Sequence, residues 1–405
     1  MSRTLKSVVL ALIIVLVACV SFLAGYGVSS QRTVVAAAAP TSQAATADEL
    51  TEKFKLFWEA WSWVEKEFYD KAKLDATSIT YGAIRGMLQS LGDTHTVFVD
   101  PQERIVNETQ LRGGFEGIGV YVEMDADGRL IIVAPQEGTP GEKAGLKPGD
   151  VITHADGKPL EGLTVYQAVS LIRGPKGTTV TLTVSRDGEP EPLTFQVVRD
   201  EIPVESVRYK MLDEHVAYLR ISQFGVQTKN ELVDALQTML AENPKGLILD
   251  LRANPGGYLI AAIDVASQFL DSGIVLYEVR ANGEKLEFPV KPGGVAVQIP
   301  MVVLIDRGSA SASEIVAGAL QDSGRAALVG ERSYGKGSMQ SVRVLSDGSG
   351  VHITIAHWLT PKEKPIEGTG LTPDVVVEMS KDGQGDTDPQ LQRALEILLG
   401  DGSNP

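Results

Sequence analysis

Three serines stand in the short stretch Gly308–Glu314, between an apolar run and a run with helical spacing. The apolar run Met301–Asp306 is typical of a buried strand, and Ile315–Leu320 has the periodicity of a helix. Small side chains at a strand-to-helix turn can expose a hydroxyl at a helix N-terminus, where unpaired N–H groups favour negative charge. Chemistry that builds up an oxyanion beside a serine needs that arrangement. Ser311-x-x-Glu314 is also a capping box, so on this stretch alone a purely structural role stays open.

A lysine between two glycines provides the second candidate group. Gly335-Lys336-Gly337 lies on a loop that directly follows another apolar run, Ala326–Gly330. A lysine in this position is poorly placed for a solvated surface face and well placed to reach into a site. These two stretches must be positioned by the rest of the chain.

Composition and charge narrow the class of protein. The 405 residues are 43% hydrophobic and 22% charged, which is ordinary for a globular chain of two or three domains. The net charge of -15 and the lack of a basic stripe argue against nucleic acid as a partner. Cys19 is the only cysteine. The sequence after it therefore has no disulfide, thiol nucleophile or cysteine metal cluster, and we expect neither a metal nor a cofactor.

The first residues predict export. No charge appears between Lys6 and Arg32, which is long enough to cross a bilayer, and the basic start favours a cytoplasmic N-terminus. The small residues of Val35–Pro40 also permit a cleaved signal peptide. Leu16–Cys19 faintly resembles a lipoprotein box, but the apolar run continues past the cysteine. We expect an uncleaved anchor at 1–35, with the remaining chain in the cell envelope, periplasmic or extracellular.

Beyond this segment, the sequence pattern divides the chain into several regions. A helical stripe of aromatic and aliphatic residues from Leu50 to Phe68 is expected to pack on a core or a partner helix rather than on a membrane, and a second helix is expected at Tyr81–Leu91. A turn and a short extended piece should follow, with His95 in a structural role. The expected divisions are a linker at 36–47, a helical region at 48–112, a unit of short strands at 113–200, alternating strands and helices at 201–380, and a polar tail at 381–405 with a short helix at Gln390–Leu399.

The unit of short strands resembles a PDZ domain. Phe115–Val120 matches the loop whose backbone N–H groups hold the carboxylate of a peptide C-terminus, and Ala144–Ile152 matches a turn typical of PDZ domains in proteases. The resemblance implies that an extended peptide adds as a strand beside Ile118-Gly119-Val120, with its carboxylate in the nest of backbone N–H groups of this loop, and that Gly117 also contributes to peptide binding. Arg173, at the end of the helix Thr164–Arg173, is placed either to pair with a carboxylate or to cap the helix.

Three motifs in order make the chain similar to the carboxy-terminal processing proteases, which are tail-specific serine peptidases of family S41. The motifs are Leu251–Gly257, Ser309–Glu314 and Tyr334–Gln340, and the resemblance runs from about Thr51 to Leu399. It implies an α/β (α+β) protease core of crotonase/ClpP-like type with an inserted PDZ domain and an N-terminal helical region. The departures from the family pattern, at Thr94, Ala253 and Asp306, touch neither of the proposed reacting groups.

The resemblance also assigns roles to single residues. It implies Ser311 as nucleophile, Lys336 as its base and Gln340 as a supporting residue. A serine needs an adjacent base, and a lysine can serve when burial lowers its pKa. The oxyanion hole would use the N–H of Ala312 and one from the Gly256-Gly257 turn, where we favour Gly257.

The sequence therefore predicts a membrane-tethered endopeptidase that captures apolar protein C-termini, possesses no cofactor and is a possible homo-oligomer. Binding of the tail to the PDZ domain is expected to gate the site. One alternative is a non-catalytic scaffold whose PDZ domain binds C-terminal tails. Another is a nucleotide-binding loop, since Gly330–Lys336 nearly matches a P-loop. It fails because Gly337 stands where Ser or Thr should hold Mg²⁺ and because a strand is expected to follow.

Overall fold

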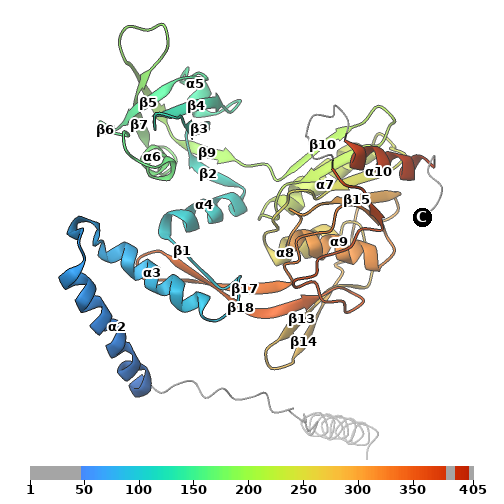
Figure 1. Ribbon diagram of the computed structural model, residues 1–405. Helices are drawn as coiled ribbons and strands as arrows, with labels where there is room; N and C mark the ends of the chain where they lie inside the picture. The colour runs from blue at the N-terminus through green and yellow to red at the C-terminus, as the bar shows by residue number, and fades with distance from the viewer. Residues whose placement is uncertain (1–46, 380–387, 401–405) are drawn as a thin grey trace, which may run out of the picture. The chain divides into compact units, whose positions relative to one another are not determined.

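The computed structural model describes residues 47–379 and 388–400 (Figure 1). Within these residues, no helix has the length and apolar character needed to cross a bilayer. The anchor or signal peptide expected at 1–35 lies outside the described residues, as does nearly all of the expected linker.

The described residues form two compact units that divide after Leu74. The first unit holds helix α2 (Ala47–Glu67) and the short 3-10 helix η1 (Lys71–Lys73). Most of the aromatic stripe along α2 is exposed, with Trp58 61% and Trp63 51% accessible. No residue of 48–67 is buried, and packing of the stripe on a core or a partner helix stays a prediction. The helical region expected at 48–112 is thus split between the two units.

The second unit begins with α3 (Ala76–Gln89), which starts earlier than expected because the Asp75 carboxylate caps it by accepting a hydrogen bond from the Ser78 N–H. The expected extended piece is strand β1 (Val97–Val99).

Helix α4 (Pro101–Arg112) follows β1 and was not expected from the sequence. Its start is fixed by Asp100, whose carboxylate accepts from the N–H groups of Gln102 and Glu103. Proline at the first helical position fits this cap, because its missing N–H would be unpaired there in any case.

The PDZ-like stretch contains a six-stranded antiparallel sheet and a capped helix. The sheet has the order β3-β4-β5-β7-β8, with β6 paired to β5, and β2 pairs separately with β9. Its core is fully buried at Ile132, Leu182 and Val184. The elements are β2 (Gly114–Gly117), β3 (Val120–Met124), β4 (Leu130–Pro135), α5 (Pro140–Lys143), β5 (Val151–Ala155), β6 (Lys158–Pro159), α6 (Val165–Ile172), β7 (Thr179–Ser185), β8 (Leu193–Val198) and β9 (Asp200–Pro203).

The protease-like stretch is organised on a six-stranded sheet of order β10-β11-β12-β15-β16-β19, parallel from β11 onward. The apolar runs of β12 and β15 are buried at every position, as strands covered on both faces require. Helices α7, α8 and α9 share one core with this sheet, and α10 forms a separate core on its other face (Figure 1). The elements are β10 (Val207–Met211), β11 (Ala217–Ile221), α7 (Thr228–Leu240), β12 (Leu247–Asp250), α8 (Leu259–Ala266), β15 (Met301–Ile305), α9 (Ala312–Asp322), β16 (Ala327–Gly330), β19 (Val375–Val376) and α10 (Pro389–Leu399).

A second, antiparallel sheet has the order β1-β18-β13-β14, with β17 paired to β18. Its strands from this part of the chain are β13 (Ile274–Arg280), β14 (Lys285–Pro289), β17 (Ser338–Val344) and β18 (Gly350–Leu359). The expected α/β architecture is confirmed. So is the strand expected directly after Lys336, which removes the helix that a P-loop needs.

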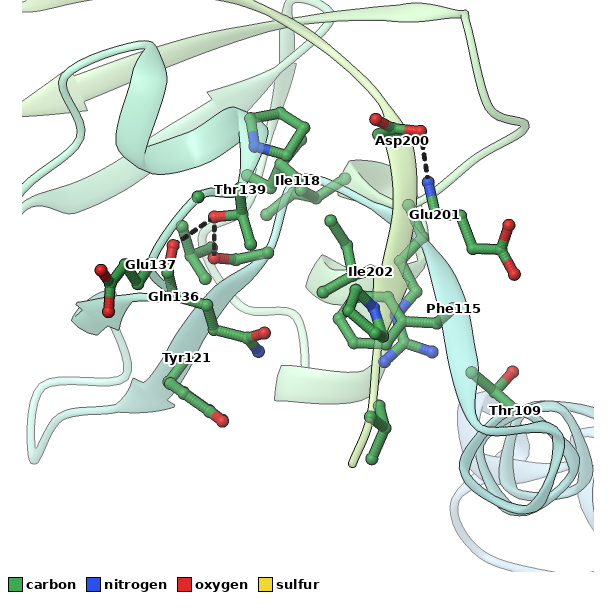
Figure 2. Close-up of a pocket in the computed structure, with 18 of the residues that line it drawn as sticks. Thr109, Phe115, Ile118, Tyr121, Gln136, Glu137, Thr139, Asp200, Glu201 and Ile202 are labelled. Atoms are coloured by element: carbon green, nitrogen blue, oxygen red, sulfur yellow. Dashed lines mark hydrogen bonds between the residues drawn. The ribbon is translucent and has the colours of Figure 1, made fainter. Parts of the chain in front are cut away.

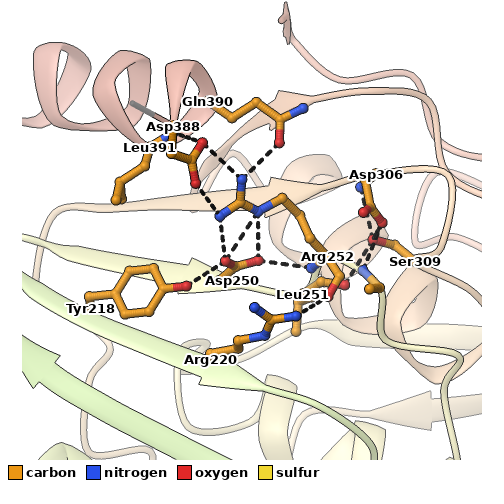
Figure 3. A network of polar contacts seen from close by, with 11 residues as sticks. Tyr218, Arg220, Asp250, Leu251, Arg252, Asp306, Ser309, Asp388, Gln390 and Leu391 are labelled. Atoms are coloured by element: carbon orange, nitrogen blue, oxygen red, sulfur yellow. Dashed lines mark hydrogen bonds and ion pairs between the residues drawn. The ribbon is translucent and has the colours of Figure 1, made fainter. Parts of the chain in front are cut away.

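A buried ion-pair network ties the end of β12 to the start of α10 (Figure 3). Arg252 contacts Asp250 at 2.7 Å and Asp388, the N-cap of α10, at 2.8 Å. Burial alone would lower the pKa of Arg252, but hydrogen bonds to the two carboxylates raise it. Tyr218 donates to Asp250, and burial together with that carboxylate raises the pKa of Tyr218 to about 12. The network anchors the loop that leads to the Gly256-Gly257 turn.

Candidate active site

Ser311 lies where the loop after β15 enters α9. Its backbone angles are φ +55° and ψ -113°, a conformation that L-residues seldom adopt and that costs on the order of 1–3 kcal/mol. The side chain is partly exposed and lines a cavity of about 680 Å³ that Lys336 also lines. Ser311 thus lines a cavity at the N-terminus of α9.

The two neighbouring serines are fully buried and committed to structure. The Ser309 hydroxyl donates to the carbonyl of Leu251 at 2.8 Å. The Ser313 hydroxyl donates to the carbonyl of Asn254, also at 2.8 Å. These bonds join the serine loop to the loop after β12, and they leave Ser311 as the serine of this stretch that faces the cavity.

Glu314 joins the serine loop to the lysine loop. One oxygen of its fully buried carboxylate accepts from the backbone N–H of Ser311 at 2.8 Å and of Lys336 at 2.9 Å. The other accepts from the Ser333 hydroxyl and the Gly335 N–H. Burial raises the pKa of Glu314, and these four hydrogen bonds oppose the rise. The capping contact expected of Glu314, to the Ser311 N–H, is present. The other three hydrogen bonds tie the same carboxylate to the lysine loop.

Lys336 is partly buried on the loop between β16 and β17. Burial lowers the pKa of Lys336, against the opposing charges of Glu367 and Glu314. The flanking glycines let other backbone approach: a Cβ on Gly337 would lie 2.4 Å from the backbone nitrogen of Glu367. No hydrogen bond joins the Lys336 ammonium to Ser311, and no ion pair to it is found among the described residues.

Gln340 and His352 line the same cavity. The Gln340 amide donates to the Ser338 hydroxyl at 2.9 Å and, more weakly, to the Thr354 hydroxyl, and makes no hydrogen bond to Lys336. His352 was not singled out from the sequence. Burial and then the charge of Lys336 lower the pKa of its imidazole, so an added proton on His352 is disfavoured.

The Gly256-Gly257 turn lies directly against the serine loop. A Cβ on Gly256 would come within 2.8 Å of the Ser311 Cβ, and one on Gly257 within 2.2 Å of the Phe224 carbonyl oxygen. The Gly256 N–H donates to the side chain of Asn254 at 2.9 Å. For the N–H groups of Gly257 and Ala312, no acceptor is found in the part of the chain that the structure describes.

Four of the five residues expected to hold a peptide line a second cavity, of about 950 Å³ (Figure 2). Ile118 is buried, Gly119 has φ +71° and Val120 begins β3. The Gly119 carbonyl accepts from the Gln136 N–H and the Thr139 hydroxyl, while its own N–H has no acceptor among the described residues. Gly117 ends β2 and does not line this cavity.

Arg173 is the C-cap residue of α6 and also lines this second cavity. Its guanidinium lies over the Phe115 ring, 4.3 Å from the centroid. Burial lowers the pKa of Arg173, and no carboxylate pairs with it among the described residues. The charge is therefore held against an aromatic face and stays available to an anion.

Comparison with known proteins supports one family. The PDZ domain model matches residues 131–186 and the peptidase family S41 model residues 215–377. The chain is 38% identical to the carboxy-terminal processing protease CtpA of Bacillus subtilis, over 81% of this chain and 69% of that protein. It is 39% identical to a carboxy-terminal-processing protease of Bartonella bacilliformis, over 81% and 74%. Among solved structures, the photosystem II D1 C-terminal processing protease is 30% identical, covering 82% and 94%, with a TM-score of 0.47.

Identity at this level over most of both chains is evidence of common descent, and both matched models lie on stretches whose folds are described above. The chain belongs to the carboxy-terminal processing proteases of peptidase family S41, a family of serine peptidases, and contains a PDZ domain.

Proposed function

We propose that the protein is an endopeptidase in which Ser311 is the nucleophile and Lys336 the general base. One observation carries the proposal: of the three serines in the loop, Ser309 and Ser313 are buried and hydrogen-bonded to carbonyls, and Ser311 shares a cavity with Lys336. Catalytic hydrogen bonds are often absent before substrate binds. The lack of a direct bond between the two groups is compatible with this role.

The reaction follows from the chemistry of the two groups. Neutral Lys336 takes the hydroxyl proton as the Ser311 oxygen attacks a peptide carbonyl, and the resulting ammonium returns a proton to the leaving amine. Water then hydrolyses the acyl-enzyme ester. The N–H groups of Ala312 and Gly257 are proposed to bind the oxyanion, because both are unpaired among the described residues whereas that of Gly256 is occupied by Asn254. Gln340 would orient Lys336 after a change of hydrogen-bond partner.

The second cavity, which Ile118, Gly119, Val120 and Arg173 line, is called the PDZ groove below. We propose that it captures an exposed apolar C-terminus. A peptide would pair with the free edge of β3, with its carboxylate near the N–H of Gly119 and the guanidinium of Arg173. Tail binding would also gate cleavage. Deleting the PDZ stretch 113–199 should then change the rate on a tailed substrate, and an unaltered rate would rule out gating.

The expected place of action is the cell envelope, with the chain tethered by its first residues and with protein or peptide substrates as partners. The reaction above has no step that calls for a metal or cofactor. Membrane tethering is proposed on the sequence of residues 1–35.

The decisive experiment measures cleavage of an unfolded protein that ends in an apolar tail. The parent protein is compared with Ser311→Ala and Lys336→Ala, with folding checked by circular dichroism. Loss of cleavage in both folded variants is the expected result. Cleavage by Ser311→Ala would rule out this nucleophile, and tail binding without cleavage by the parent would favour the non-catalytic scaffold.

A further inference from the structure

Glu367 has an unusual carboxylate. Its Oε2 atom is the one buried side-chain oxygen or nitrogen without a hydrogen-bond partner in residues 47–379 and 388–400. An unpaired buried acceptor costs about 1–3 kcal/mol, more when charged, so such an atom calls for an explanation.

The backbone places this carboxylate beside the lysine loop. The Gly368 N–H donates to the Gly335 carbonyl at 2.9 Å, and Gly337 is in van der Waals contact with the backbone of Glu367. The segment around Glu367 therefore runs along both glycines that flank Lys336. On the other side, the Trp358 N–H of β18 donates to the Gly337 carbonyl at 2.9 Å.

Two histidines from other elements face Glu367. His95, in the loop before β1, has its Nε2 3.3 Å from Glu367 Oε1. His357 of β18 has its Nδ1 3.9 Å from Oε2, beyond hydrogen-bond range. One carboxylate oxygen is thus held by His95, and the other remains open for a different donor.

The other charged groups around Lys336 are already paired or have the wrong charge. Asp264, which lines the same cavity, pairs with Lys291 at 2.6 Å. Both oxygens of Glu314 are taken by four donors. His352 lines the same cavity, and its protonated form would repel an ammonium. Glu367 accordingly has the buried carboxylate oxygen near Lys336 that lacks a hydrogen-bond partner among the described residues.

We propose that Glu367 is a positioning residue for Lys336, stabilising with its open oxygen the ammonium that forms when the lysine takes the Ser311 proton. His95 fixes the carboxylate by holding its other oxygen. This inference rests on the proposed function. The charge of Glu367 is also the largest of the opposing influences that keep the pKa of Lys336 from falling further.

The test measures the protonation of Lys336 without relying on cleavage. The full chain carrying Ser311→Ala is labelled with acetic anhydride across a pH series, and acetylation of the Lys336 peptide is quantified by mass spectrometry. Adding Glu367→Gln removes the negative charge that stabilises the Lys336 ammonium. The pH at which labelling is half-maximal should therefore fall by about one unit, and at pH values below both midpoints Lys336 should be labelled roughly tenfold more. An unchanged midpoint overturns the proposal.

Two further variants make the result specific. Glu363→Gln removes a nearby carboxylate that pairs with Lys285 instead, and should leave the midpoint unchanged. Glu367→Asp keeps the charge and should shift the midpoint by less than Glu367→Gln does. An equal fall in either variant contradicts the proposal.

The same substitutions are then made in the active protein. The acid limb of the pH dependence of kcat/KM should move downward in Glu367→Gln, together with the labelling midpoint. The parent protein could fail to cleave the substrate while Glu367→Gln still shifts the labelling midpoint. That result would contradict the proposed function alone, because the labelling measures the protonation of Lys336 in a chain without Ser311.

Discussion

In the PDZ groove, the groups proposed to bind a peptide come from one contiguous stretch, Ile118–Val120, and one helix end. The Ser311 cavity, in contrast, is assembled from loops far apart in the sequence. The groove offers backbone groups that need only the local turn at Gly119. The cavity depends on buried side chains, Glu314 and Ser313, that join one loop to the next. Changes in the groove should therefore weaken substrate capture, and changes in the cavity should damage chemistry and folding together.

The largest effect is expected from Ser311→Ala. Removing a nucleophile typically costs about 10⁴- to 10⁶-fold in kcat. The protein should stay folded, because the structural role of the Ser311 side chain is that of a helix N-cap, whose loss costs about 0.5–2 kcal/mol. The measurement is kcat on a tailed substrate.

Ser313→Ala is the matched control for that prediction. It leaves the Asn254 carbonyl without its hydroxyl partner and should lower the free energy of unfolding by about 1–3 kcal/mol while cleavage persists. If a folded Ser313→Ala protein did not cleave the substrate, Ser313 rather than Ser311 would be assigned as the nucleophile.

Glu314→Ala should produce the next largest effect. Four donors lose their acceptor, and both the serine loop and the lysine loop lose their common anchor. We expect a loss of about 2–4 kcal/mol in the free energy of unfolding and a fall in kcat of about 10²- to 10³-fold from misplacement of the reacting groups. Chemical denaturation and steady-state kinetics measure the two. A normal kcat would show that the loops hold their geometry without this carboxylate.

The pH dependence of kcat/KM probes the cavity alone. Lys336 acts as a base only when neutral, so activity should rise about tenfold per pH unit below its pKa and level off above it. Because burial lowers that pKa from the ordinary value of 10.5, the limb should lie below the range of an exposed lysine. If the rise of kcat/KM with pH had its midpoint at the ordinary lysine pKa of 10.5, the base would not be a buried lysine.

Arg173→Ala tests the groove. It removes the cation that stacks on Phe115 and faces the peptide cavity, so KM for a substrate with a free C-terminus should rise by about tenfold, as expected for one charge-assisted contact. The kcat value should change little. A substrate with an amidated C-terminus is the control, since it should bind parent and variant alike. An equal loss on both substrates would point to a structural role for the arginine.

The sequence predicted the structure of the PDZ groove more fully than that of the Ser311 cavity, for a physical reason. The PDZ motif is local, and its strands and the helix at Val165–Ile172 lie where alternation and capping predict them. The strand-to-helix turn at Ser311 and the lysine loop after β16 were also visible. Nothing in the sequence could show that Glu314 spans to Gly335, that Gly256 rather than Gly257 has its N–H occupied, or that His95 meets Glu367. Each of these contacts depends on loops brought together only by the folded sheet.

The smallest effects are expected from the two histidines beside Glu367. In the proposed mechanism neither imidazole exchanges a proton with Ser311. His357→Ala should therefore change kcat by less than about threefold, because its ring lies 3.9 Å from the carboxylate and is largely exposed. His95→Ala should cost several-fold, because it frees the carboxylate oxygen that His95 holds at 3.3 Å. Complete loss of cleavage in a folded His95→Ala protein would assign the proton transfer to that imidazole and contradict the Ser311–Lys336 pair, because a lysine base would still be present in the cavity.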